Sequence, residues 1–166
     1  LRWWTAPANP AALMQRGLSR SGLRRSVPVE VACMCDILLI DDDVSFSRHF
    51  AEYVAERYPR ISLNSCANPL EALPLLKTSR YDLVLVDFEM PVLDGRKLVH
   101  FALQAGVAPK QIVLLSGHEA DLLHEICPAG VCLAVLNKFE ERQREVLDMI
   151  LASLSNKSGK DTPDVC

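Results

Sequence analysis

Five polar residues each stand at the end of an apolar run, and their types suit chemistry on a phosphoryl group. Asp41 and Asp42 follow one run, and Asp87, Ser116 and Lys138 each follow another. Two carboxylates about 4 Å apart repel by roughly 4 kcal/mol at an effective dielectric of 20, so the three Asp residues call for a cation or a raised pKa. Hard oxygen ligands suit Mg²⁺, and an ammonium and a hydroxyl suit phosphoryl oxygens, with one carboxylate as nucleophile.

The elements that must bring these residues together are short parallel strands. Four continuous apolar runs predict strands covered on both faces, and Ile61 to Cys66 alternates as a half-exposed edge strand does. Strands alternating with amphipathic helices predict a doubly wound α/β sheet of five strands, with ligands at the carboxyl ends where strand order reverses. The four runs are Ile37 to Ile40, Leu83 to Val86, Ile112 to Leu115 and Val131 to Leu136.

Capping residues locate the starts of two helices. Asp43 reads as the N-cap of the first helix, which removes it from the list of site residues, and Asn68-Pro69 reads as a cap followed by proline at the first helical position. Pro74 should kink or shorten that second helix.

The chain divides by composition into a leader, one domain and a tail. Residues 1–33 carry five Arg against Glu30 and show no sustained periodicity, so we read them as a disordered leader. Their composition also fits a transit peptide, and Met34 fits a natural start with over-extended translation before it. Residues 34–154 are the expected domain, with a net charge of -7, and residues 155–166 a disordered tail.

The charge, the apolar runs and the cysteines argue against several classes of protein. An acidic domain would be repelled by nucleic-acid phosphates. No apolar run reaches the roughly 20 residues of a membrane span. The six cysteines lack a secretory signal and a zinc-ligand pattern, so reduced thiols in a cytoplasmic protein are expected.

The motifs resemble those of the response-regulator receiver domains of two-component signalling, from about Asp36 to Leu154. Taken alone each motif is weak, but the whole set in order at strand ends is specific. The resemblance implies the flavodoxin-like strand order 2-1-3-4-5 with five helices. The motifs are Asp41-Asp42, the segment from Tyr81 to Pro91 around Asp87, Asp94-Gly95, Leu115-Ser116-Gly117 and Asn137-Lys138-Phe139.

The resemblance also implies a role for each site residue. Asp87 would be the phosphoacceptor, with Lys138 and Ser116 binding the phosphoryl oxygens. Asp42 would bind Mg²⁺ directly, Asp41 largely through water, and the backbone carbonyl of Glu89 would complete the ligands. Gly117 would keep the approach open, and Pro91 and Asp94-Gly95 would shape the loop after Asp87.

Two departures from the family pattern affect how phosphorylation would be transmitted to a partner protein. Phe139 stands where the family usually has a proline after the lysine, often with a cis bond. Val135 stands at the switch position that is typically Tyr or Phe, so no rotating ring can couple to Ser116 from there. The side chain of Glu89 adds a carboxylate at the rim.

The expected function is that of a stand-alone receiver rather than an enzyme with an external substrate. A sensor histidine kinase or histidine phosphotransfer protein would phosphorylate Asp87. The fourth helix, the last strand and the last helix would contact a target or a second copy of the chain. One alternative is a haloacid-dehalogenase-like aspartyl-phosphate phosphatase, although that family has Asp, not Glu89, two residues after its nucleophile. Another is a pseudo-receiver that only binds a partner.

Overall fold

The computed structural model describes residues 34–117 and 130–157, which contain one parallel sheet. The strand order is β2-β1-β3-β4-β5, as the resemblance implies, and every neighbouring pair is parallel. Order reverses between β1 and β3, so a crevice is expected outside their carboxyl ends. The strands are β1 (Cys35–Ile40), β2 (Ile61–Cys66), β3 (Leu83–Asp87), β4 (Ile112–Ser116) and β5 (Ala134–Asn137).

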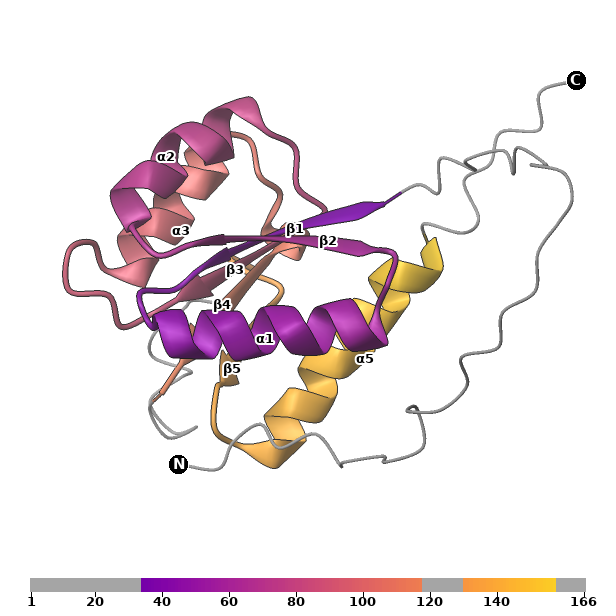
Figure 1. Ribbon diagram of the computed structural model, residues 1–166. Coiled ribbons are helices and arrows are strands. Elements are labelled where there is room, and N and C mark those ends of the chain that lie inside the picture. The colour runs from indigo at the N-terminus through magenta and orange to yellow at the C-terminus, as the bar shows by residue number, and fades with distance from the viewer. Residues whose placement is uncertain (1–33, 118–129, 158–166) are drawn as a thin grey trace, which may run out of the picture. The chain divides into compact units, whose positions relative to one another are not determined.

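Helices cover both faces of the sheet, as a doubly wound fold requires. Figure 1 shows α2 and α3 on one face and α1 and α5 on the other. The described residues hold four α-helices and a 3-10 turn at Pro109–Gln111; the remaining expected helix, between strands four and five, lies outside the described residues. The helices are α1 (Val44–Arg57), α2 (Pro69–Thr78), α3 (Gly95–Gln104) and α5 (Glu141–Lys157).

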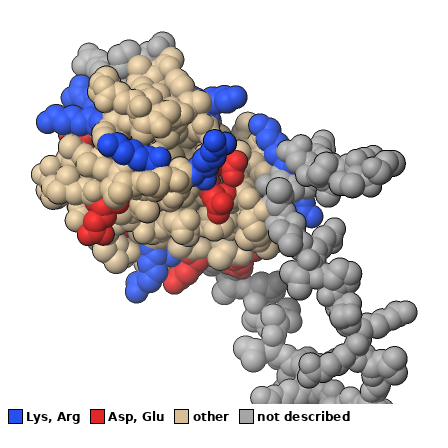
Figure 2. All heavy atoms as spheres, turned by 90° about the horizontal axis from the view of Figure 1, so that it is seen from above, with Lys and Arg blue, Asp and Glu red and all other residues tan. Residues whose placement is uncertain are grey.

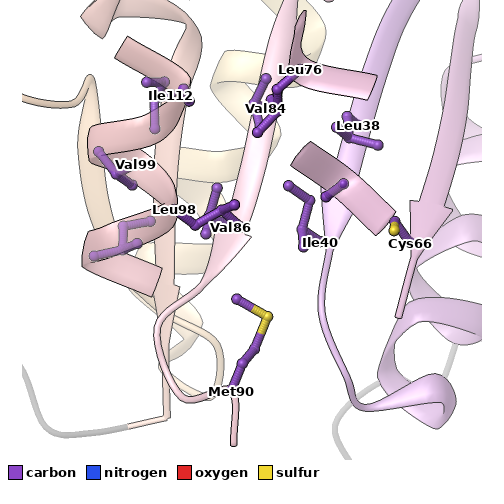
Figure 3. Close-up of a cluster of buried hydrophobic side chains, with 13 residues drawn as sticks. Leu38, Ile40, Cys66, Leu76, Val84, Val86, Met90, Leu98, Val99 and Ile112 are labelled. Atoms are coloured by element: carbon purple, nitrogen blue, oxygen red, sulfur yellow. The ribbon is translucent and has the colours of Figure 1, made fainter. Parts of the chain in front are cut away.

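The core on the α2 and α3 face anchors the loop that follows β3. Alternate residues of the strands point to this face, because side chains alternate along a strand. Figure 3 shows Val86 of β3 beside Leu98 of α3 and Val84 beside Leu76 of α2, with Met90 below them at the carboxyl end of the strand. Met90 is only 7% exposed, so its burial holds the loop directly after Asp87.

Both predicted caps are confirmed. Asp43 accepts hydrogen bonds from the backbone N–H groups of Ser45 and Phe46, and Asn68 accepts one from Leu70. Pro74 lies inside α2 and does not end it, since the helix continues to Thr78; the predicted kink stays a prediction. Proline at this place has no N–H to donate to the carbonyl of Leu70, and Leu70 is half-exposed, so water can satisfy that carbonyl.

The last strand and last helix differ from the sequence reading at their ends. β5 begins at Ala134 rather than Val131 and lies at a sheet edge, so it is half-buried instead of covered on both faces. An apolar run shows burial but not the residue at which pairing starts. α5 extends to Lys157, beyond Leu154.

The expected leader, 1–33, and the tail from 158 lie outside the described residues. No helix in the described part combines the length and apolar character of a bilayer-crossing segment.

Candidate functional site

The carboxyl ends of four strands place the predicted residues at one edge of the sheet. Asp41 follows β1, and its N–H donates to the carbonyl of Cys66 at 3.1 Å. Asp87 is the last residue of β3 and Ser116 the last residue of β4. The N–H of Lys138, just after β5, donates to the carbonyl of Ser116 at 2.7 Å. The backbone ladder therefore fixes these positions before any side chain interacts.

The Lys138 ammonium lies between two buried carboxylates. Its Nζ is 2.7 Å from Oδ2 of Asp41 and 2.9 Å from Oδ1 of Asp87. Asp41 is fully buried, and Lys138 is 8% exposed. No hydrogen bond from another group reaches either of these two oxygens within the described residues, so each depends on the ammonium. This arrangement confirms that the three residues converge.

Burial and charge shift the pKa values of these groups. Burial raises the pKa of Asp41 to about 6, against the opposing effect of Lys138. For Lys138, burial lowers the pKa, but the two carboxylates outweigh burial and the net shift is upward. The lysine therefore stays charged, and Asp41 is the group whose proton occupancy changes near neutral pH.

Three carboxylates form a cluster that fits a hard divalent cation. Asp41, Asp42 and Asp87 each offer a carboxylate oxygen, and these oxygens lie within 4.8 Å of one another. Asp41 and Asp87 are buried, whereas Asp42 is exposed. Oδ1 of Asp41 accepts from the N–H of Asp43 at 2.9 Å, which fixes its orientation. All donors are oxygens, and the exposed side leaves room for water, as Mg²⁺ requires.

Glycine is needed at position 95 for a reason that the sequence reading missed. A Cβ on Gly95 would lie 2.3 Å from the carbonyl oxygen of Asp87 and 2.7 Å from Cα of Phe88. The first residue of α3 thus packs directly on the backbone that carries Asp87. Its role is close approach rather than turn geometry, and no hydrophobic or charge pattern in the sequence would reveal it.

Gly117 has different neighbours. A Cβ there would lie 2.9 Å from Oε2 of Glu89 and 3.2 Å from a ring carbon of Phe139. Both neighbours are side-chain atoms, so they can move. The Glu89 carboxylate therefore lies at the rim beside Gly117, while the predicted role of its backbone carbonyl as a ligand stays a prediction.

The loop after Lys138 uses the N–H that a proline would lack. The N–H groups of Phe139 and Glu140 donate to Oδ1 of Asn137 at 2.6 Å and 3.1 Å. The described residues contain no cis peptide bond. Asn137 thus shapes this loop in a trans form. Val135 lies half-buried in β5, in keeping with a site that has no aromatic switch there.

One further residue contacts the site, and its sequence context did not indicate that contact. The Lys138 Nζ lies 4.9 Å from the centroid of the Phe46 ring, on the first turn of α1. Phe46 fits the apolar stripe of α1, and that pattern hid its contact with the site. Its position four residues after Asp42, at the same edge of the sheet, was the available signal.

Comparison with known proteins points to one family. The family described as the response regulator receiver domain matches residues 37–150. A response regulator receiver protein from Anaeromyxobacter is 31% identical over 101 residues, which cover 61% of this chain and 41% of that protein. A protein-glutamate methylesterase/protein-glutamine glutaminase from Photobacterium profundum is 30% identical over 129 residues, 74% of this chain and 32% of that protein. The chain thus spans less than half of either relative.

Solved structures of the same fold agree. The receiver domain of a Francisella response regulator has a TM-score of 0.56 at 23% identity, covering 75% of this chain and 98% of that one. A CheY-like receiver domain protein from Methanospirillum hungatei has a TM-score of 0.60 at 20% identity, covering 76% and 99%. At these identities the likeness concerns the fold.

Proposed function

This chain belongs to the response regulator receiver domain family, and from that membership we propose that Asp87 accepts a phosphoryl group from a histidine of a partner protein. The observation that carries the proposal is the buried carboxylate of Asp87 at the end of β3, with the Lys138 ammonium 2.9 Å from its Oδ1. Membership of this family already makes the chain a signalling receiver of two-component systems.

The proposed step is an in-line transfer to a carboxylate oxygen. An oxygen of Asp87 forms a bond to phosphorus while the bond between phosphorus and the partner's histidine nitrogen breaks. That nitrogen keeps the electron pair and takes a proton from solvent. The product is an acyl phosphate on Asp87. Negative charge accumulates on the phosphoryl oxygens during transfer, so fixed positive charge and hydroxyl donors at those oxygens lower the barrier.

Lys138 and Ser116 would meet the phosphoryl oxygens. The ammonium of Lys138 is already held at the acceptor carboxylate, so it needs no large movement to pair with an added phosphoryl group. Ser116 is fully buried at the end of β4, adjacent to β3 in the sheet. A short shift of its hydroxyl would supply a hydrogen bond on the other side. Gly117 and the rim formed by Glu89 and Phe139 would govern access.

Asp41, Asp42 and Asp87 would hold Mg²⁺, with the Glu89 carbonyl as a further ligand. A bound divalent cation would neutralise charge on the transferring oxygens. The chain itself orients these ligands. The N–H of Asp43 fixes the carboxylate of Asp41, and the carboxylate of Asp42 is exposed, so the water bound to it can leave readily when the cation binds.

The proposed partners are a histidine kinase or phosphotransfer protein and a downstream protein target. The proposed contact surface for a target or a second copy includes β5 and α5, together with the segment between β4 and β5 that lies outside the described residues. On the face seen in Figure 2, basic and acidic side chains are interspersed among neutral ones, which gives no support to direct nucleic-acid binding. The proposed domain is residues 34–154, acting in the cytoplasm.

Intact-mass spectrometry tests this function. The wild type, Asp87→Asn and the control Asp36→Asn are incubated with acetyl phosphate, with and without Mg²⁺. Asp36 lies at the opposite end of β1, so its variant controls for loss of one carboxylate. We expect one Mg²⁺-dependent phosphoryl adduct on the wild type and Asp36→Asn, and none on Asp87→Asn. Equal labelling of Asp87→Asn would overturn the assignment, and sustained phosphate release over many turnovers would indicate a phosphatase.

A further inference from the structure

Phe46 carries a role at the site beyond its place in the apolar stripe of α1. We propose that its ring is a positioning residue that holds the Lys138 ammonium at the acceptor carboxylate by a cation–π interaction. This proposal rests on the function proposed above. The ring centroid lies 4.9 Å from Nζ of Lys138, within the range over which the negative face of an aromatic ring attracts a cation.

The position of the ring is fixed from two sides. The Asp43 carboxylate accepts the N–H of Phe46 at 3.0 Å, so the first turn of α1 is tied to the loop that carries Asp41 and Asp42. Phe50, one turn later, stacks on Phe46 with ring centroids 5.8 Å apart and planes within 9°. Phe50 itself is buried. The ring is therefore backed by the core and held at its N-terminal end by a cap.

Burial of the cation distinguishes the Lys138–Phe46 pair from the other cation–π pairs in the described part of the chain. Arg57 lies over Tyr53, Lys77 over Phe101 and Arg96 over Phe88, and all three of those cations are exposed. Lys138 is buried. A cation–π interaction is stronger when the cation has lost its water, because the water no longer competes with the ring.

An aromatic ring suits this position because it attracts the ammonium without adding a hydrogen-bond acceptor or a negative charge. An ammonium has three N–H donors, and two carboxylate oxygens contact Lys138. A third carboxylate there would take the last donor and add negative charge against an incoming phosphoryl group. The Phe46 ring attracts the ammonium without becoming an acceptor that the phosphoryl oxygen must displace. It also covers the ammonium on that side and so limits its exchange with water.

The contact itself can be tested without any phosphoryl transfer. In NMR spectra, protons of the Lys138 side chain near the ring face should be shifted upfield by the ring current. We expect this shift in the wild type and in Phe46→Tyr, which keeps the ring, and its loss in Phe46→Leu, which keeps apolar bulk. A wild-type Lys138 without an upfield shift would overturn the proposal. Preserved dispersion of the remaining signals shows that each variant is folded.

Phosphorylation rates then test the positioning role. With acetyl phosphate and Mg²⁺, Phe46→Leu should be phosphorylated about tenfold more slowly than the wild type, and Phe46→Tyr should recover most of the rate. The matched control is Phe101→Leu, because the Phe101 ring lies 5.1 Å from the ammonium of the exposed Lys77. That variant should match the wild type.

The outcomes separate this proposal from the assignment of Asp87. If the wild type is labelled and Phe46→Leu is labelled equally fast, the positioning role is refuted while the function of Asp87 stands. If Phe46→Tyr is as slow as Phe46→Leu, apolar packing and not the ring face accounts for the effect, and the proposal fails. If the wild type is not labelled at all, the function proposed above fails, and the role of Phe46 in transfer fails with it.

Discussion

Replacing Lys138 by methionine should destabilise the fold by about 3–5 kcal/mol at pH 7, because it leaves two buried carboxylates without a partner. The ammonium contacts Asp41 at 2.7 Å and Asp87 at 2.9 Å, and each contact is worth roughly 6 kcal/mol at an effective dielectric of 20. Most of that gross attraction is offset in the wild type by dehydration of the ammonium. Methionine keeps the length of the side chain, so the loss is mainly electrostatic.

Proton uptake sets the upper limit of this loss. A carboxyl with an ordinary pKa near 3.9 can be protonated at pH 7 for about 4 kcal/mol. The pKa of Asp41 is already raised to about 6 by burial in the wild type, so most of the free-energy cost of burying this carboxyl group is present before the substitution. Asp41 therefore adds only about 1 kcal/mol to the loss, and the remainder comes from the Asp87 carboxylate left without its ammonium partner. This limit agrees with the range expected for a broken buried ion pair.

The pH dependence gives the prediction its sign. Without Lys138, burial acts on both carboxyl groups with no ammonium to oppose it, so the folded state binds protons that the unfolded state does not. Stability is then greatest below the unfolded pKa and falls as pH rises. The difference between wild type and Lys138→Met should therefore shrink as pH falls below about 7, by about 1.4 kcal/mol per pH unit for each proton that the folded variant binds and the folded wild type does not.

Urea unfolding followed by far-UV circular dichroism at pH 7 and pH 5 measures both effects. Tryptophan fluorescence is a poor reporter, since Trp3 and Trp4 both lie before the described domain. Lys97→Met, at an exposed position of α3, serves as the control and should change stability by less than about 0.5 kcal/mol. A loss below about 1 kcal/mol at pH 7, or a loss independent of pH, would refute the reasoning.

Three further predictions follow from the same site and its supports. The affinity for Mg²⁺ should fall as pH drops below about 6, because the cation competes with a proton on Asp41; calorimetry that found equal affinity at about pH 5 and about pH 7.5 would contradict this. Gly95→Ala should cost at least about 2 kcal/mol and slow phosphorylation, because its Cβ meets backbone, whereas Gly117→Ala meets only movable side chains and should cost under about 1 kcal/mol; equal losses in urea unfolding would be evidence against that distinction. Tyr53→Phe should cost about 1–2 kcal/mol, because the Tyr53 hydroxyl donates to the Asp148 carboxylate at 2.6 Å and joins α1 to α5; an unchanged unfolding midpoint would rule that out.

The doubly wound sheet and the convergence of the charged residues could be predicted because both follow from local patterns, whereas the strand order was implied by the resemblance to receiver domains. Apolar runs of strand length, separated by amphipathic helices, allow few topologies, and parallel strands end at the same edge of the sheet. A polar residue directly after such a run must therefore lie near that edge. This reasoning correctly placed Asp41, Asp87 and Lys138, since the structure brings each of the two carboxylates within 3 Å of the Lys138 ammonium.

What the sequence left hidden depends on three-dimensional approach. Gly95 is needed because α3 begins against the backbone of Asp87, and a spacing pattern carries no information about that distance. Phe46 belongs to the apolar stripe of α1 and also contacts the site, so its apolar character indicated only the first role. The start of β5 was misplaced because Val131 to Leu133 are apolar, yet pairing with β4 begins at Ala134.

The charge balance of the site explains why the fold carries strain that a partner or ion can relieve. Three carboxylates face one ammonium, so the cluster has a formal charge of -2 with all four groups ionised. Burial raises the pKa of Asp41, and the neighbouring Asp87 carboxylate adds to this shift. Only Asp42 is exposed, and it is the carboxylate best placed to admit a hydrated ion. A protein selected for stability alone would neutralise one of the buried Asp residues. Their presence together, around a lysine that an aromatic ring holds in place, is understandable if the site must accept positive charge first and an added phosphoryl group second.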